Sequence, residues 1–289
     1  MTIKSVFVVG GGLMGRGIAQ VCAQAGLQVG IMDIDPAILE KSIENIAWSV
    51  GKLVEKGKLT EEKQVVMDRI KICADYADAA RSDMAIEAVF ERLEIKQEVF
   101  KELDSCCLPQ ALIASNTSAI PITELAAVTG RPQQVLGIHF FNPVPLMPAV
   151  EVVKALQTSE ETIQVGETFV KALGKSPVRV QSDVAGFLLN RINLVGYVEA
   201  IRLLEQGIGT VADIDRGVRL AFGRPMGPFE TGDMVGLDVS YGALSAIYEE
   251  SHEMRFYPPR LLQRKVKAKQ LGRKTGQGWY TYDQEGKNR

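Results

Sequence analysis

Two side chains that can exchange protons lie close together in sequence, in an apolar part of the chain. His139 closes an apolar segment, residues 135–138, and Glu151 stands among alanine and valine residues at 149–153. An imidazole has a pKa of about 6.5, so it can take up or release a proton near neutral pH. A carboxylate buried without a partner is costly, and His139 is the obvious partner for Glu151. The pair predicts general acid/base chemistry, with the glutamate orienting the histidine.

The chain has two histidines, and the second, His252, is flanked by Ser251 and Glu253. This charged surrounding indicates a solvated helix end rather than a site. A single histidine in an apolar stretch can also be a hydrogen-bonded core residue, so the sequence leaves that alternative open for His139. So few histidines argue against a zinc site, and no metal is expected.

A glycine-rich loop follows the first apolar segment and opens a helical pattern. The motif Gly-x-Gly-x-x-Gly begins at Gly10 and includes Gly12, Leu13, Met14 and Gly15. In such loops the first glycine permits a tight turn, the second lets the backbone approach a pyrophosphate, and the third lets helix and strand pack closely. The helix N-terminus offers N–H groups and a positive dipole end to phosphates. We therefore expect these five residues to bind a dinucleotide, with a purely structural turn as the alternative.

An acidic residue ends the second expected strand at the distance that dinucleotide folds require. Asp33 can accept hydrogen bonds from the ribose hydroxyls, whereas a 2′-phosphate there would be repelled and no arginine is adjacent. The expected cofactor is therefore NAD rather than NADP. Asp35, just before Pro36, is expected to cap a helix.

The elements that must position these residues alternate between strands and helices in the first part of the chain. Strands are expected at residues 6–9, 28–33, 70–72, 84–89, 111–114, 135–139, 150–153 and 178–180, and the clearest helices at 13–25, 36–56, 91–103 and 160–173. Such alternation is typical of an α/β fold, a Rossmann-type and mostly parallel sheet covered on both faces.

The pattern changes near Asp183, after which helical spacing of apolar residues dominates and strand signals almost vanish. Further helices are expected near residues 213–222, 239–250 and 259–271. The sequence thus predicts an NAD-binding Rossmann-like domain at 1–183 and an all-α C-terminal domain at 187–289. Helices this apolar often pack against more than their own domain, which favours a second subunit.

The composition is that of an ordinary globular protein. The 289 residues are 46% hydrophobic and 24% charged, with a formal net charge of −2. Near-neutral charge gives no reason to expect nucleic acid or an anionic membrane as a partner. No apolar run is long enough to span a bilayer, and no signal peptide is expected before the first strand. The four cysteines lack C-x-x-C spacing, so reduced thiols in the cytoplasm are expected.

Several motifs carry a resemblance that spans essentially the whole chain. They are Ser-Asn-Thr-Ser at 115–118, His-Phe-Phe-Asn-Pro at 139–143 with Glu151, Gly-Phe-Leu-Leu-Asn-Arg at 186–191, Pro-Met-Gly-Pro-Phe-Glu at 225–230, and Gly-Arg-Lys-Thr-Gly-Gln-Gly-Trp-Tyr at 272–280. In order and spacing the chain resembles the 3-hydroxyacyl-CoA dehydrogenase family, which includes bacterial 3-hydroxybutyryl-CoA dehydrogenases. The resemblance implies NAD-dependent oxidation of an (S)-3-hydroxyacyl-CoA, and its reversal.

The resemblance also implies roles for individual residues. His139 is the general acid/base, Glu151 orients it, and Ser118 and Asn190 hydrogen-bond the reacting oxygen of the substrate. The alternatives are that Ser118 caps a helix near Pro121 and that Asn190 is an ordinary polar helix residue. A homodimer formed by the helical domain is implied in the same way.

Further residues are implied to contact the cofactor or coenzyme A. Glu91, Lys96, Ser118, Asn142 and Lys274 match positions that line NAD in the family, although Glu91 and Lys96 could also belong to a solvated helix face. Coenzyme A carries phosphates, and lysines near the end of the second helix, Lys52 among them, could contact it; solvated surface is the alternative.

Two other functions remain open from the sequence. One is an NAD-dependent dehydrogenase of the same fold that acts on a free hydroxy acid or sugar acid. The other is a non-enzymatic structural or NAD-binding protein, which would have no use for the set His139, Glu151, Ser118 and Asn190.

Overall fold

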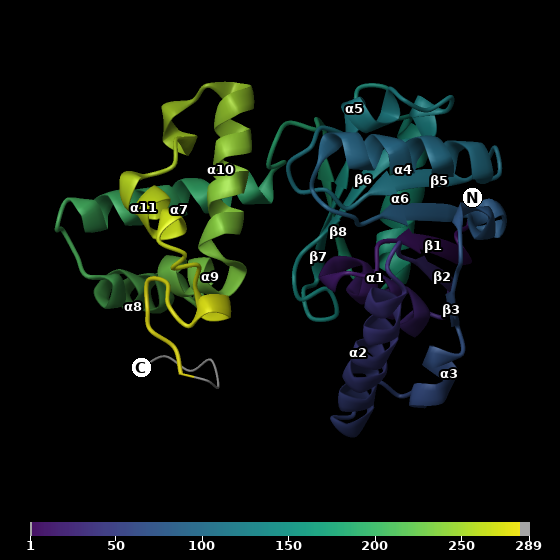
Figure 1. The fold of residues 1–289 in the computed structure, drawn as a ribbon, viewed down its shortest axis with the longest axis horizontal. Helices are drawn as coiled ribbons and strands as arrows, with labels where there is room; N and C mark the ends of the chain where they lie inside the picture. Colours follow the sequence, from purple (N-terminus) through teal and green to yellow (C-terminus); the bar gives the residue numbers. More distant parts are fainter. Residues whose placement is uncertain (1, 284–289) are drawn as a thin grey trace. The chain divides into compact units, whose positions relative to one another are not determined.

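The computed structural model describes residues 2–283 and divides into two compact units, unit 1 at Met1–Asp183 and unit 2 at Val184–Arg289. Unit 1 contains a sheet with helices on both faces, and unit 2 is helical (Figure 1). The expected fold class, a Rossmann-type α/β domain followed by an all-α domain, is confirmed.

The sheet of unit 1 has eight strands in the order β3-β2-β1-β4-β5-β6-β7-β8. Their bounds are β1 Ser5–Val9, β2 Gln28–Met32, β3 Ile70–Ile72, β4 Met84–Glu87, β5 Leu112–Ser115, β6 Val135–Phe140, β7 Ala149–Val153 and β8 Ser176–Val180. All neighbouring pairs are parallel except β6 with β7, which is antiparallel. The strands from β1 to β6 therefore end at the same edge of the sheet.

The helices of unit 1 connect these strands. They are α1 Leu13–Gln24, α2 Pro36–Glu55, α3 Lys63–Met67, α4 Leu93–Cys106, α5 Ile122–Ala126 and α6 Glu160–Ala172, with short 3-10 turns η1 Tyr76–Arg81 and η2 Pro132–Gln134. The short helix α3 was not expected, because five residues hold too little of a helical pattern to be recognised, whereas α5 begins next to Pro121, where a helix was considered.

The strands alternate their side chains between two covered faces. A Cβ added to Gly166 of α6 would meet Leu136 and Ile138, whereas one added to Gly137 would meet Ile122 of α5. α6 and α5 therefore cover opposite faces of β6, because successive strand residues point to opposite sides. The odd-numbered residues of β6, including position 139, share the α5 face.

Two local features correct the expected boundaries. The strand expected at 84–89 ends at Glu87, and the helix expected at 91–103 begins only at Leu93. The segment between them turns because the N–H of Val89 donates to the Glu87 carboxylate over 2.7 Å instead of continuing the ladder. Glu91 is consequently a loop residue and not part of a helix face.

Unit 2 is built from five helices among the described residues, α7 Leu189–Glu205, α8 Val211–Phe222, α9 Pro228–Val235, α10 Leu237–Ser251 and α11 Arg260–Lys267, with 3-10 turns η3 Met254–Phe256 and η4 Arg273–Thr275. Their core includes Val198, Phe229, Leu244 and Leu262. His252 lies exposed at the C-cap of α10, so its expected place at a solvated helix end is confirmed.

Two buried carboxylates organise unit 2. Asp215 accepts hydrogen bonds from the backbone N–H groups of Phe229 and Glu230, at 2.8 and 2.9 Å. Asp233 accepts from the N–H of Trp279 and from the hydroxyl of Tyr282, both at 2.8 Å. The Asp215 bonds join α8 to α9, and the Asp233 bonds join residues 279–282 to α9. Both sets supply partners for carboxylates that would otherwise be costly to bury.

Candidate active site

The carboxyl ends of five parallel strands gather the residues that the sequence singled out in unit 1. Gly10 follows β1, Asp33 follows β2, Glu91 lies beyond β4, Ser118 lies beyond β5, and His139 is near the end of β6. In open α/β sheets this edge is where ligands bind. The fold therefore brings residues far apart in sequence to one side of the sheet.

His139 and Glu151 form a buried pair. They lie directly opposite each other in the antiparallel β6–β7 ladder, so their side chains share one face. The distance from His139 Nδ1 to Glu151 Oε2 is 2.7 Å, and the side chains are 7% and 0% exposed. This geometry suits a carboxylate that fixes the tautomer of an imidazole and turns its Nε2 atom toward a reactant.

Neighbouring contacts fix the histidine further. The ring of Phe141 lies 4.6 Å from the imidazole, centroid to centroid, with the two planes tilted by 57°. The N–H of Phe140 donates to the side-chain oxygen of Asn116 over 2.9 Å, which ties the end of β6 to the segment after β5. Asn116 belongs to the Ser-Asn-Thr-Ser motif, but its role in holding β6 was not predicted.

The glycines of the loop differ in whether the packing of the chain itself requires them. Gly10 has φ +106°, and an added Cβ would lie 2.5 Å from the carbonyl oxygen of Ala88; at Gly15 it would lie 1.8 Å from that of Gly10. These two glycines are required by the packing of the chain itself. A Cβ at Gly12 would meet nothing within 4 Å. The open space at Gly12, at the N-cap of α1, fits the approach of a pyrophosphate, as does the uncapped helix start at Leu13 and Met14.

Asp33 and Ser42 hold the glycine loop from the second βα unit. Asp33 accepts a hydrogen bond from the N–H of Gly11 over 2.7 Å and one from Asp35 over 3.0 Å. Each carboxylate oxygen keeps a further lone pair that can accept from a ribose hydroxyl. The hydroxyl of Ser42 donates to the carbonyl of Gly11, a contact that the sequence did not reveal. Asp35 caps α2 through the N–H of Ala37, as expected.

The buried Lys96 side chain lies between the carboxylates of Glu87 and Glu91. Its ammonium contacts Glu87 Oε1 at 2.6 Å and Glu91 Oε2 at 3.1 Å, and its side chain is 1% exposed. A solvated helix face is therefore wrong for Lys96. Glu87, itself fully buried, was not predicted, although an acid within an apolar strand gives the same signal as Glu151.

Glu91 holds the loop that carries Ser118. Its Oε1 atom accepts from the hydroxyl of Thr117 at 2.5 Å and from the N–H groups of Ser118 and Ala119 at 2.9 and 3.2 Å. Burial raises the pKa of Glu91, but the Lys96 charge and these donors outweigh it, so the pKa lies below its usual range. The helix α5 begins after Pro121 without a cap from Ser118, which removes that alternative.

The other residues expected in unit 1 are more exposed. Asn142 is exposed just after β6. Lys52, in the last turn of α2, is 47% exposed and forms an ion pair with Glu55 at 2.7 Å. The Lys52–Glu55 ion pair does not exclude a ligand, since an exposed ion pair is easily exchanged.

Two expected site residues belong to unit 2. Asn190 is half-buried in the first turn of α7. Lys274 lies in η4, and its ammonium is 2.7 Å from Asp238 Oδ2. Asp233 is buried against the glycines on either side of Lys274, because a Cβ at Gly272 or Gly278 would collide with it.

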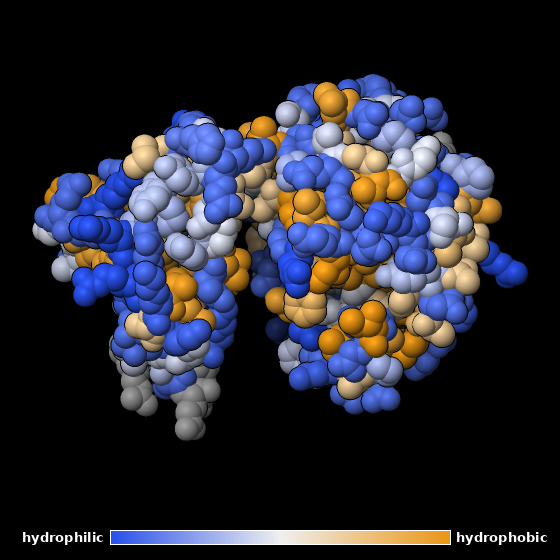
Figure 2. Space-filling model, turned by 45° about the horizontal axis from the view of Figure 1, so that its top comes forward, coloured by the Kyte–Doolittle hydropathy of each residue, from blue (hydrophilic) through white to orange (hydrophobic). Residues whose placement is uncertain are grey.

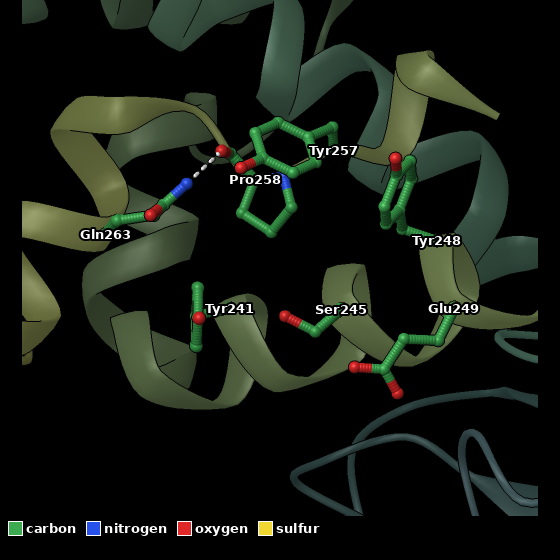
Figure 3. Close-up of a pocket in the computed structure, with 7 residues that line it drawn as sticks. All are labelled: Tyr241, Ser245, Tyr248, Glu249, Tyr257, Pro258 and Gln263. Carbon is green, nitrogen blue, oxygen red and sulfur yellow. Dashed lines mark hydrogen bonds between the residues drawn. The ribbon is translucent and has the colours of Figure 1, made fainter. Parts of the chain in front are cut away.

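A cavity of about 250 Å³ in unit 2 contains none of the expected residues. Figure 3 shows its lining, in which Tyr241, Ser245 and Glu249 come from α10 and Tyr257 and Pro258 precede α11. Tyr248 and Tyr257 stack edge to face with centroids 5.1 Å apart. The wall of this cavity is aromatic and polar.

No cluster of three or more histidine, cysteine or acidic side chains within residues 2–283 has an arrangement suited to a metal ion. In the same residues, none of the helices has the length and apolar character required to cross a membrane.

Curated relatives match almost the full chain. The chain is 41% identical over 286 residues to the "Probable 3-hydroxybutyryl-CoA dehydrogenase" of Bacillus subtilis (strain 168), with 99% of both chains covered. It is 42% identical to a "3-hydroxybutyryl-CoA dehydrogenase" of Mycobacterium tuberculosis, covering 97% of this chain and 99% of that one. The "Hydroxyacyl-coenzyme A dehydrogenase, mitochondrial" of Sus scrofa is 41% identical, with 97% and 91% covered.

Solved structures and family models agree with these matches. FadB2 of M. tuberculosis superimposes with a TM-score of 0.94 at 42% identity, and (S)-3-hydroxybutyryl-CoA dehydrogenase PaaH1 of Ralstonia eutropha with 0.93 at 41%, each over 98% of this chain and 100% of the other. The model "3-hydroxyacyl-CoA dehydrogenase, NAD binding domain" matches residues 5–184, and "3-hydroxyacyl-CoA dehydrogenase, C-terminal domain" matches residues 186–282. The chain therefore belongs to the 3-hydroxyacyl-CoA dehydrogenase family, as an NAD-dependent dehydrogenase that contains both of the family's domains.

Proposed function

We propose that this enzyme interconverts (S)-3-hydroxybutyryl-CoA and acetoacetyl-CoA, with His139 as the general acid/base. The observation that carries the proposal is the 2.7 Å contact between His139 Nδ1 and Glu151 Oε2 in a buried cross-strand pair. A histidine held in this way at the ligand edge of the sheet is suited to moving a proton on and off a hydroxyl.

In the oxidative direction, Nε2 of His139 accepts the proton of the 3-hydroxyl as a hydride leaves the carbon that bears this hydroxyl. Glu151 accepts a hydrogen bond from Nδ1–H, which keeps Nε2 ready for the proton and stabilises the imidazolium that forms. In reduction the same Nε2 atom returns the proton to the carbonyl oxygen. Ser118 and Asn190 donate hydrogen bonds to that oxygen, where negative charge develops.

The cofactor is held by the loop and by the strand ends. NAD supplies the ring that accepts or returns the hydride. The backbone at Gly12, Leu13 and Met14 would receive the pyrophosphate, and Asp33 would accept hydrogen bonds from the ribose hydroxyls. Glu91, Lys96, Asn142 and Lys274 complete the nicotinamide side in this proposal.

The substrate class follows from the names of the relatives together with one surface feature. Bacterial relatives of similar length are named for the four-carbon thioester. Coenzyme A phosphates need cations, and Lys52 is exposed near the end of α2 to provide one.

We also propose a homodimer formed through unit 2. In α8, Asp215 is the one buried residue, whereas Leu220 and Phe222 are 80% and 72% exposed. Figure 2 shows apolar side chains among the polar ones on the surface of unit 2. An uncovered apolar helix favours contact with a second copy. Sedimentation should give a dimer for the wild type and a monomer for Leu220→Glu combined with Phe222→Glu.

A cytoplasmic location completes the proposal. The four cysteines are free thiols, and burial raises the pKa of Cys73 and of Cys107 to about 11. Protonated thiols are weak nucleophiles, which suits cysteines that remain reduced.

The test is NADH oxidation with two acceptors, acetoacetyl-CoA and free acetoacetate. We expect turnover of the thioester and little turnover of the free acid. Equal efficiency with both would replace the proposal by a dehydrogenase of free hydroxy acids, and NADH binding without any turnover would leave a binding protein.

A further inference from the structure

We propose that Glu87 is a positioning residue of this active site, one that sets the geometry of Lys96, Glu91 and Ser118 without contacting the substrate. The inference rests on the proposed function for its turnover measurements, but not for its measurements of NADH affinity.

Glu87 stands at the junction of three segments. It ends β4 in the middle of the sheet, where it pairs in register with Val9 of β1 and with Ser115 of β5. Its side chain is fully buried, with both carboxylate oxygens engaged. Oε2 accepts from the Ser115 hydroxyl at 2.6 Å, and Oε1 accepts from the Lys96 ammonium at 2.6 Å.

One branch of these contacts reaches the glycine loop. The Glu87–Lys96 pair holds both backbone groups of Val89, since its N–H donates to Glu87 Oε1 at 2.7 Å and its carbonyl accepts from Lys96 at 3.4 Å. A Cβ added to Gly10 would lie 3.2 Å from Val89 N, so this fixed segment packs against the first glycine of the loop. The pair therefore fixes the segment that packs against the glycine loop.

The other branch reaches Ser118. The Ser115 hydroxyl that donates to Glu87 also accepts from the N–H of Thr117 at 3.0 Å. Lys96, held by Glu87, contacts Glu91 at 3.1 Å, and Glu91 accepts from the N–H of Ser118 at 2.9 Å. Glu87 thus reaches the Ser118 loop by two separate routes, through Ser115 and through Lys96.

Stability alone does not account for these buried charges. The cost of desolvating two ions offsets much of their attraction, and apolar side chains of similar size commonly replace such a pair without loss. An apolar pair, however, cannot form directional hydrogen bonds with neighbouring groups. Glu87 accepts hydrogen bonds from Val89 and Ser115, and Lys96 contacts Glu91, itself an expected cofactor contact.

A double-mutant cycle with Glu87→Met and Lys96→Met separates positioning from stability. Methionine matches glutamate in length, is one atom shorter than lysine, and removes both charges. For each variant we would measure the thermal midpoint, the Kd for NADH by fluorescence without substrate, and kcat with acetoacetyl-CoA. Glu98→Gln is the matched control. Glu98 lies on α4, the helix that contains Lys96; its side chain is 71% exposed and forms an ion pair with Lys101.

Each single variant should lower the midpoint, because it leaves one buried charge without its partner. The double variant should recover only part of the midpoint, because it has no unpaired charge at positions 87 and 96 but leaves the Val89 N–H and the Ser115 hydroxyl without their acceptor. Its kcat and NADH affinity should stay as low as those of Lys96→Met alone, with a fall in kcat of about 10²-fold, the size that a misplacement of about 1 Å produces. The control should match the wild type in all three quantities.

Two outcomes would overturn the inference. Recovery of kcat and NADH affinity together with the midpoint would make Glu87 purely structural, and multiplicative losses in the double variant would mean that Glu87 acts independently of Lys96. If the wild type bound NADH but did not reduce acetoacetyl-CoA, the proposed substrate would fail, while the NADH cycle would still decide the role of Glu87.

Discussion

Glu151 lies opposite His139 across an antiparallel strand pair and contacts its Nδ1 atom at 2.7 Å, with neither side chain more than 7% exposed. Glu151→Gln keeps the shape and can still accept from Nδ1–H, but it removes the charge that stabilises an imidazolium. We expect a folded enzyme with a wild-type thermal midpoint within a few degrees and kcat lowered by about 10²-fold or more. Glu161→Gln, on the exposed start of α6, is the control, and unaltered kinetics in Glu151→Gln would rule out the orienting role.

His139→Gln removes the proton-exchanging group. Turnover with acetoacetyl-CoA should fall by about 10²–10⁴-fold, the range that general acid/base catalysis supplies, while the Kd for NADH changes little. The chain offers a matched control in His252, whose φ of +54° at the end of α10 suits asparagine. His252→Asn should retain wild-type turnover. A His139→Gln enzyme with most of its activity would exclude His139 from the mechanism.

Asp33→Ala should narrow the preference for NADH over NADPH. The substitution removes the charge that repels a 2′-phosphate and also the acceptor of the Gly11 N–H bond, so NADH affinity should fall as NADPH use rises. The ratio of kcat/KM for the two cofactors measures this. Asp35→Ala is the control: it removes the cap of α2 and costs about 1 kcal/mol of stability, with an unchanged ratio. A constant ratio in Asp33→Ala would contradict the assignment.

Glu91 makes the stability of unit 1 depend on pH. Because its pKa is lower in the folded chain than in the unfolded chain, its carboxylate stabilises the fold above the unfolded pKa of about 4.3. That stabilisation disappears as the pH falls through the folded pKa. Glu91→Gln should therefore lower the thermal midpoint at pH 7, and the difference from the wild type should shrink below about pH 4. A difference that is constant from pH 7 to pH 3 would show that charge is not its source.

Asp233→Ala should destabilise unit 2 strongly. It leaves the N–H groups of Trp279 and Tyr280 and the hydroxyl of Tyr282 without their acceptor. Each unsatisfied buried donor costs roughly 1–3 kcal/mol, so the free energy of unfolding should drop by about 3 kcal/mol or more in urea titrations. Glu199→Ala, exposed on α7, should change it by no more than about 0.5 kcal/mol. A small effect at Asp233 would mean that water replaces the carboxylate.

Much of the fold was predictable because its signals are local. The β-branched runs placed the eight strands within a few residues, and glycine, proline and aspartate marked the starts of α1 and α2. The reversed direction of β7 and β8 was not predicted, because a pattern of apolar residues indicates a strand but not its direction. α9, only eight residues long, was also missed.

The candidate site was predictable where a motif or an isolated charge drew attention to it. His139, Glu151, Asp33 and the glycine loop lie at the expected edge of the sheet. Glu87 was missed even though it stands in the apolar segment Met84–Glu87, because it could be paired only once β4, β5 and α4 were placed together. Patterns in a single sequence do not reveal such contacts between distant segments of the chain.

The opposed direction of β7 has a consequence for redesign of this enzyme. Strand pairing follows a two-residue parity, so one residue inserted into β7 would turn the acid away and present a valine to the imidazole. Lengthening the connection between residues 141 and 148 leaves that parity intact. Changes of length belong in the connection beyond Asn142, whereas β7 does not accept them.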